Sequence, residues 1–169
     1  MQVRTMIKVA AAGAALLVAA TPASAAVTTT NLSVTATVAA SCTVSTTAMA
    51  FGTISTLTAT ADDNTATMNV TCTPGTPWTA TAGLGTGTGA TFAVRKLTIP
   101  STTNTLNYAL YTNSTRTTLW GDGVAPNGSY TGTGTGAVQP NTIYGRVPGS
   151  QGTSVIGSYT DSVVVTITF

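Results

Sequence analysis

The chain has 169 residues, of which 43% are hydrophobic and only 6% are charged, and it contains no histidine and no glutamate. These absences remove the side chains that most often act as general bases, and neither a Ser-His-Asp nor a Cys-His arrangement can be built. Six basic and four acidic residues form no basic patch for nucleic acid. We therefore expect no enzyme, no cofactor, no metal, no small-molecule substrate and no nucleic-acid partner.

Residues 1–25 have the three-part layout of a secretory signal peptide. Arg4 and Lys8 give a positive start, residues 9–20 form an apolar run, and Ala-Ser-Ala at residues 23–25 precedes the expected cleavage. The run is about a dozen residues long, whereas a membrane-spanning helix needs about 20. We therefore predict an exported chain that begins at residue 26, with the size of one domain.

Residues 31–38 alternate strictly between apolar and polar side chains. Such a period of two predicts a strand with one buried face. That face consists of Leu32, Val34, Ala36 and Val38.

Shorter strands are predicted along the rest of the chain, where runs of Val, Thr, Ile and Tyr alternate with Gly, Pro, Asn and Asp clusters. They fall at residues 42–44, 49–54, 66–72, 78–82, 90–99, 106–111, 129–136, 143–147 and 162–169. Turns or loops are predicted at residues 62–64, 74–77, 83–89, 121–123, 127–128 and 140–141. In the last strand, one face carries Val163, Val165, Ile167 and Phe169. This spacing predicts a single all-β sandwich.

Cys42 and Cys72 form an even pair in the exported part of the chain, which predicts a disulfide. Closing this loop would contribute about 3–4 kcal/mol. The disulfide would fix the start of the domain and leave residues 26–40 outside the covalent loop.

The first and last predicted strands contain no charged residue that would protect an exposed edge. Such edges are either covered within the domain or pair with another chain. Four apolar side chains buried at about 1.5–3 kcal/mol each give about 6–12 kcal/mol gross, which is comparable to the stability of a domain. The strand at residues 31–38 is therefore able to stabilise a receiving domain by strand addition.

The exported part resembles the spore coat protein U domain of Csu-type (archaic) chaperone–usher pilins. The resemblance rests on five motifs in this order: NLSVTATVAASCTVS, MAFGTIS, MNVTCTPGTPWT, LNYALYT and GSYTDSVVVTITF. The last motif is the most specific, because Gly157, Tyr159 and Asp161 lead into an alternating strand that ends on an aromatic residue.

This resemblance implies an incomplete immunoglobulin-like β-sandwich that lacks its final strand. A periplasmic chaperone would supply that strand, and the N-terminal extension of the next subunit would replace it at an outer-membrane usher. Residues 26–40 would then be the donor extension, with Leu32, Val34, Ala36 and Val38 as donor residues, and residues 41–169 the pilin domain. The receiving groove would be bordered by Val163, Val165, Ile167 and Phe169. The product would be a cell-surface homopolymer, a pilus shaft that serves adhesion and biofilm formation.

Two other functions stay open on the residues themselves. A monomeric carbohydrate-binding sandwich would stack sugars on Trp78 and Trp120, although such aromatics are more often buried in a sandwich. A protective spore or cell coat component would share the fold of a pilus subunit. Among the acidic residues, Asp62 and Asp63 are expected in a turn, and Asp161 is expected to bond backbone near Tyr159.

Overall fold

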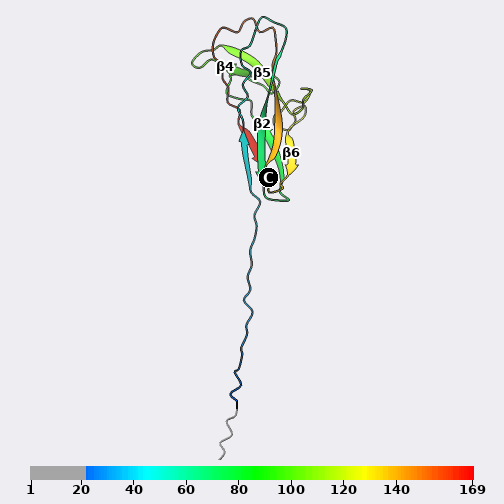
Figure 1. The fold of residues 1–169 in the computed structure, drawn as a ribbon. Coiled ribbons are helices and arrows are strands. Elements are labelled where there is room, and N and C mark those ends of the chain that lie inside the picture. The colour runs from blue at the N-terminus through cyan, green and yellow to red at the C-terminus, as the bar shows by residue number, and fades with distance from the viewer. Residues whose placement is uncertain (1–21) are drawn as a thin grey trace, which may run out of the picture. The chain divides into compact units, whose positions relative to one another are not determined.

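A computed structural model describes residues 22–169 (Figure 1). The predicted signal peptide therefore lies almost entirely outside the described residues. The chain divides into two units, residues 1–36 and residues 37–169. In the first unit, residues 22–36 contain no helix or strand, and their side chains are exposed. Residues 22–169 contain no helix long and apolar enough to cross a membrane.

The second unit is a sandwich of two antiparallel sheets, which confirms the predicted all-β, immunoglobulin-like fold class. Its strands are β1 (Cys42–Thr46), β2 (Asp62–Cys72), β3 (Pro77–Ala82), β4 (Arg95–Thr98), β5 (Thr105–Tyr111), β6 (Tyr130–Thr133), β7 (Gln139–Val147) and β8 (Val165–Thr168). One sheet has the order β1-β2-β7-β5-β4, and the other has the order β6-β3-β8. The first and last strands of the unit, β1 and β8, are therefore both at sheet edges.

Alternating side chains build the core between the two sheets, as a period of two requires. In β2 the buried face carries Met68, Val70 and Cys72. The other core residues come mainly from β3, β5 and β7, together with a tryptophan before β6: Trp78, Ala80, Ala82, Leu106, Tyr108, Leu110, Trp120, Ile143 and Val147. The Nε1 of Trp120 donates a hydrogen bond to the carbonyl of Ala80 at 3.1 Å, so the most deeply placed indole is also satisfied.

The structure corrects two predicted breaks. Residues 62–64 are not a turn, because they pair in β2 with residues 145–147 of β7. The Asp63 carboxylate is tolerated there because Arg146, its partner across the ladder, donates Nε to it at 2.7 Å. Pro140 lies inside β7 rather than in a loop, at a position where β7 pairs with β2 but not with β5. A missing N–H is harmless on that unpaired side.

The disulfide between Cys42 and Cys72 is present, with an S–S distance of 2.01 Å. The two cysteines face each other in the register of β1 and β2. The disulfide thus fixes the start of the edge strand β1 to its neighbour.

Candidate functional site

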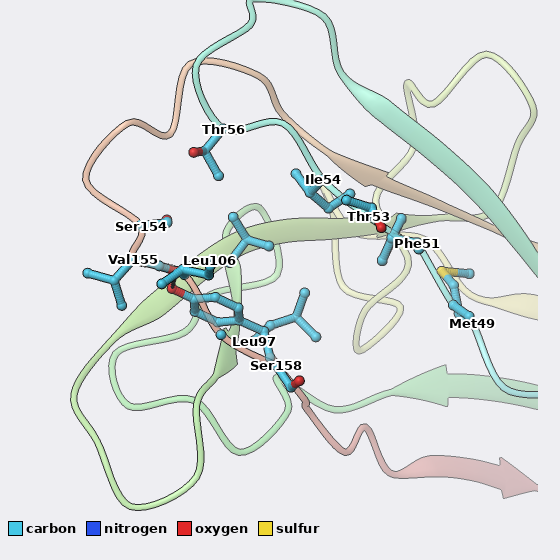
Figure 2. Close-up of a pocket in the computed structure, with 15 residues that line it drawn as sticks. Met49, Phe51, Thr53, Ile54, Thr56, Leu97, Leu106, Ser154, Val155 and Ser158 are labelled. Carbon is cyan, nitrogen blue, oxygen red and sulfur yellow. Dashed lines mark hydrogen bonds between the residues drawn. The ribbon is translucent and has the colours of Figure 1, made fainter.

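Two adjoining cavities of about 780 and 270 Å³ form one groove on the sandwich, and they share Met49, Phe51 and Leu97. We call it the edge groove. Its first wall is residues 46–56, which run on from β1, and its second wall is residues 154–165, which lead into β8. Figure 2 shows Phe51 and Ile54 on the first wall, and Leu97 and Leu106 beside Ser158 and Val155 of the second wall.

The edge groove exposes part of the hydrophobic core. Its floor includes buried core residues, among them Leu106, Tyr108 and Trp120. Apolar side chains of both walls pack against the core but are only half-buried: Met49, Phe51, Ile54, Tyr159, Val163 and Val165. A sandwich that closes on itself would cover such side chains. Along this groove, no further strand or loop among residues 37–169 covers the apolar side chains of the core.

The edge strand β8 presents free backbone groups beside the groove. Gly83 N–H donates to the Val164 carbonyl at 2.9 Å, so Val164, Thr166 and Thr168 direct their backbone groups towards β3. Because these groups alternate along a strand, Val163, Val165 and Ile167 direct theirs to the unpaired edge. The same three residues turn their side chains towards the core.

The face predicted for the last strand is present over these three residues, and its role as the border of a receiving groove stays a prediction. Phe169 is 56% exposed, and Val163 precedes β8 rather than belonging to it.

The edge strand β1, on the other side of the groove, has the same arrangement. Thr73 N–H donates to the Ser41 carbonyl and Thr47 N–H donates to the Thr67 carbonyl, both at 2.9 Å, so odd-numbered residues from 41 to 47 bond to β2. Cys42, Val44 and Thr46 consequently turn their backbone groups to the unpaired edge. Thr46 of β1 and Val165 of β8 both line the smaller cavity. Two free strand edges thus border one groove.

The edge groove is narrow beside β1, where the smaller cavity lies, and wider towards the larger cavity. Some Cα atoms of β1 and β8 lie within 8 Å of each other, whereas two strands that flank a third are about 9–10 Å apart. The larger cavity lies between residues 52–56 and residues 154–158.

The part of the first wall that was predicted as a strand, residues 49–54, contains no strand in the structure. It is held by packing and by one side chain instead. A Cβ atom on Gly145 would overlap the Met49 sulfur and lie 2.8 Å from Phe51. The side chains of Met49 and Phe51 therefore pack directly on the backbone of Gly145 in β7. The amide of Asn64 in β2 donates to the Ala50 carbonyl.

The second wall contains the three residues of the C-terminal motif. A side chain on Gly157 would collide with Ile99, and the Tyr159 hydroxyl donates to the Val155 carbonyl at 2.8 Å. Asp161 accepts from the backbone N–H of Ser162, three residues after Tyr159, as predicted, and also from the backbone N–H of the distant Thr86. All three residues therefore shape one border of the groove.

The predicted donor residues lie outside every strand of the structure, since residues 31–38 pair with no other described segment. Leu32, Val34 and Val38 are 86%, 81% and 83% exposed, and Ala36 is exposed as well. Their role as a donor strand stays a prediction.

Both tryptophans of the sugar-binding hypothesis are buried in the core. Trp78 is 4% exposed and Trp120 is 1% exposed. Their N–H groups are used within the fold, by Gln139 at 3.3 Å and by Ala80. Neither ring offers a face on which a sugar would stack.

Comparisons with known proteins agree with this architecture. A family model described as Spore Coat Protein U domain matches residues 28–166. "Protein U" of Myxococcus xanthus is 36% identical over 176 residues, which cover 95% of each protein.

Among solved structures, a similar fold occurs in the CsuC–CsuE chaperone–tip adhesion subunit pre-assembly complex from archaic chaperone–usher Csu pili of Acinetobacter baumannii. The TM-score is 0.58 at 20% identity, and the match covers 79% of this chain and 40% of that one. At this identity the likeness concerns the fold alone, and this chain spans less than half of that chain's length. The family model and the Myxococcus relative together show that the chain belongs to the Spore Coat Protein U domain family.

Proposed function

We propose that this chain is a structural subunit of a chaperone–usher pilus and that it polymerises by placing residues 31–38 in the edge groove of another copy. The observation that carries the proposal is the edge groove itself, where two free strand edges border uncovered core side chains. One added strand would pair with both edges and cover those side chains. Strand addition of this kind combines backbone hydrogen bonds with pockets for alternate side chains.

The donor segment has the chemistry that this groove requires. Its four apolar residues, at every second position from Leu32 to Val38, extend over about 20 Å in a strand. They are exposed in the single chain, so their burial in a partner would be a net gain in buried apolar area. No charged side chain occurs between residues 26 and 61 to oppose the transfer.

A second copy suits the groove better than the chain's own extension. To enter its own groove beside β1, the chain would have to reverse direction within Ala39-Ala40-Ser41. This segment lacks the Gly, Asn or Asp that tight hairpins use. Its backbone is also in use, because Ser41 accepts a hydrogen bond from Thr73.

Insertion beside β1 requires the edge strand β8 to move outward, because the present separation is too small for a third strand. Only four residues of β8 pair with β3, so its displacement breaks few backbone bonds. The wider cavity is the end at which the donor has room without such a movement.

The partners and location follow from the same proposal. The solved relative is a complex of a chaperone with a tip adhesion subunit from archaic chaperone–usher pili. By analogy we place this chain with a periplasmic chaperone, an outer-membrane usher and identical or related subunits, in a cell-surface fimbrium. We assign the sandwich unit, residues 37–169, to the filament shaft, and adhesion and biofilm formation would be the outcome of the filament.

A coat function is the second candidate, since the family model is named for a spore coat protein. It would use the same strand addition and differ only in where the polymer accumulates. Immunogold labelling of intact cells distinguishes a filament from a continuous layer.

The test of strand exchange compares the exported chain, residues 26–169, with a version that lacks residues 26–40. We expect filaments by electron microscopy, and a ladder of boiling-resistant multimers on a gel, from the longer chain alone. Filaments from the truncated chain would end the proposal. Added peptide 26–40 should bind the truncated chain without restoring its polymerisation.

A further inference from the structure

The carboxylate of Asp161 joins three separate parts of the sandwich at the second wall. Its Oδ1 accepts hydrogen bonds from the backbone N–H and the hydroxyl of Thr86, both at 2.7 Å. The same oxygen accepts from its neighbour Ser162 N–H at 2.7 Å, and Oδ2 accepts from the Tyr108 hydroxyl at 2.6 Å. Asp161 therefore connects the segment before β8 to the loop after β3 and to β5.

All hydrogen bonds that this carboxylate accepts come from neutral donors. Among residues 22–169, the ion pairs join Asp63 to Arg116 and Arg146, and none includes Asp161. Burial raises the pKa of Asp161, but the hydrogen bonds from Tyr108, Thr86 and Ser162 outweigh this effect and hold the pKa below its ordinary value. The ionised form is thus the one that the site fits.

The loop that carries Thr86 is a firm anchor. The guanidinium of Arg95, which is fully buried, donates to the Gly83 carbonyl at 3.1 and 2.9 Å and to the Trp120 carbonyl at 2.6 Å. Gly85 has φ +91°, and a Cβ atom there would overlap the Asp161 carboxylate. The glycine therefore allows the close approach by which Thr86 reaches Asp161.

The contact with Tyr108 extends across the floor of the edge groove. Tyr108 is 5% exposed, and its ring packs edge-on against Phe51 at 6.3 Å between centroids. Phe51 belongs to the first wall and Asp161 to the second, and both line the smaller cavity. Tyr108 thus lies between the two walls, with its ring against one and its hydroxyl bonded to the other.

We propose that Asp161 is a positioning residue for strand binding, which holds the second wall against Thr86 and Tyr108 and so keeps the edge groove open. This inference rests on the proposed function. Without the carboxylate, the second wall before β8 is still joined to β4 by the bridge between Thr98 and Thr160, and to β5 by the Ser154 hydroxyl, which donates to the Thr105 carbonyl at 3.0 Å. Between these bonds and β8, however, no side chain then ties residues 161–163 to the loop after β3 or to Tyr108. The half-buried Val163 and Val165 would then move towards Met49 and Phe51, because closing the groove removes apolar surface from water.

The test measures binding of a fluorescent peptide of residues 26–40 to the monomeric exported chain, together with the urea midpoint of the chain without peptide. The variants are Asp161→Ala, the conservative Asp161→Asn, and Tyr108→Phe, which removes one of the four donors. The matched control is Asp63→Ala, which breaks carboxylate bonds to Arg146 and Arg116 and lines neither cavity.

Binding is measured at a urea concentration chosen for each variant so that the two variants have the same free energy of unfolding. Under these conditions we expect Asp161→Ala to weaken peptide binding at least tenfold more than Asp63→Ala does. Asp161→Asn should recover part of the affinity, since its amide oxygen still accepts from Thr86. Tyr108→Phe should fall between the wild type and Asp161→Ala, and it keeps the test open if Asp161→Ala does not fold.

Equal affinities of the Asp161 and Asp63 variants at matched stability would overturn the inference and leave the proposed function intact. A wild-type chain that does not bind the peptide would overturn the proposed function, and this inference with it.

Discussion

The side chain of Met49 occupies the space that a Cβ atom on Gly145 would need. Gly145 lies in the middle of β7, opposite Asn64 of β2 and Leu110 of β5. A glycine in a strand interior ordinarily weakens the strand, and it often marks the close approach of another part of the chain. Here the approaching part is the first wall of the edge groove.

Gly145→Ala should therefore displace the first wall and destabilise the fold by about 1–3 kcal/mol, as overpacking does. Urea unfolding measures the loss. Gly152→Ala is the matched control, because its Cβ atom would meet only Leu57 at an ordinary 3.6 Å and its φ is not positive. Equal midpoints for both variants would show that the wall does not depend on the bare glycine.

The disulfide gives a second prediction. Replacing both Cys42 and Cys72 by alanine should cost about 3–4 kcal/mol, the stabilisation expected for a closed loop of about 30 residues. The loss should be accompanied by faster amide exchange in β1, which has a pairing partner on one side only. Unfolding of the wild type with and without reductant checks the value. A reduced wild type as stable as the oxidised one would contradict it.

Much of the sandwich could be predicted from the sequence because its strands alternate. Met68 and Val70 of β2 are fully buried, as the period of two requires. The turn predicted at residues 62–64 is wrong because a pairing partner overrides the local residue preference. Asp62 and Asp63 have the composition of a turn, yet they extend β2 because Arg146 lies opposite Asp63.

The walls of the edge groove were harder to predict, because they depend on contacts between distant residues. Asp161 and Thr86 are 75 positions apart, and nothing near either residue indicates the other. The same holds for Gly145 and Met49. The C-terminal motif did point to Asp161, but its bonding partners became clear only from the packing of β5 and the loop after β3.

Stability should be nearly constant between about pH 5 and 9, because the chain has no histidine. The hydrogen bond from Arg146 lowers the pKa of Asp63, and the pKa of Asp161 is lowered as well. Both carboxylates therefore stabilise the folded state at pH values above their ordinary pKa of 3.8, and this stabilisation is lost as the pH falls below that value.

At the alkaline end, burial raises the pKa of Tyr108 and of Tyr130 above the ordinary 10.0. Folding then favours the neutral phenols, so stability is lost as the pH rises through 10. Thermal melting from pH 2 to 12 measures both limits. A change in melting temperature of more than a few degrees between pH 5 and 8 would be inconsistent with this assignment.

The donor segment provides the sharpest test of strand exchange, because neighbouring residues have opposite roles. Val34 belongs to the apolar face of residues 31–38, and Thr35 belongs to the polar face. Both side chains are exposed in the single chain, so an aspartate at either position should leave the melting temperature of the monomer unchanged. In the filament, Val34→Asp would bury a carboxylate without a partner, which costs several kcal/mol.

Val34→Asp should therefore abolish filaments, whereas Thr35→Asp should form them at close to the wild-type rate. Negative-stain microscopy and the boiling-resistant ladder read out both variants. Mixing supplies a further check, because a Val34→Asp chain still has an intact edge groove. Added to wild-type chains, it should accept one donor and end the filament, so that filaments shorten in proportion to the fraction of variant. If both variants polymerised alike, residues 31–38 would not be the strand that enters the groove.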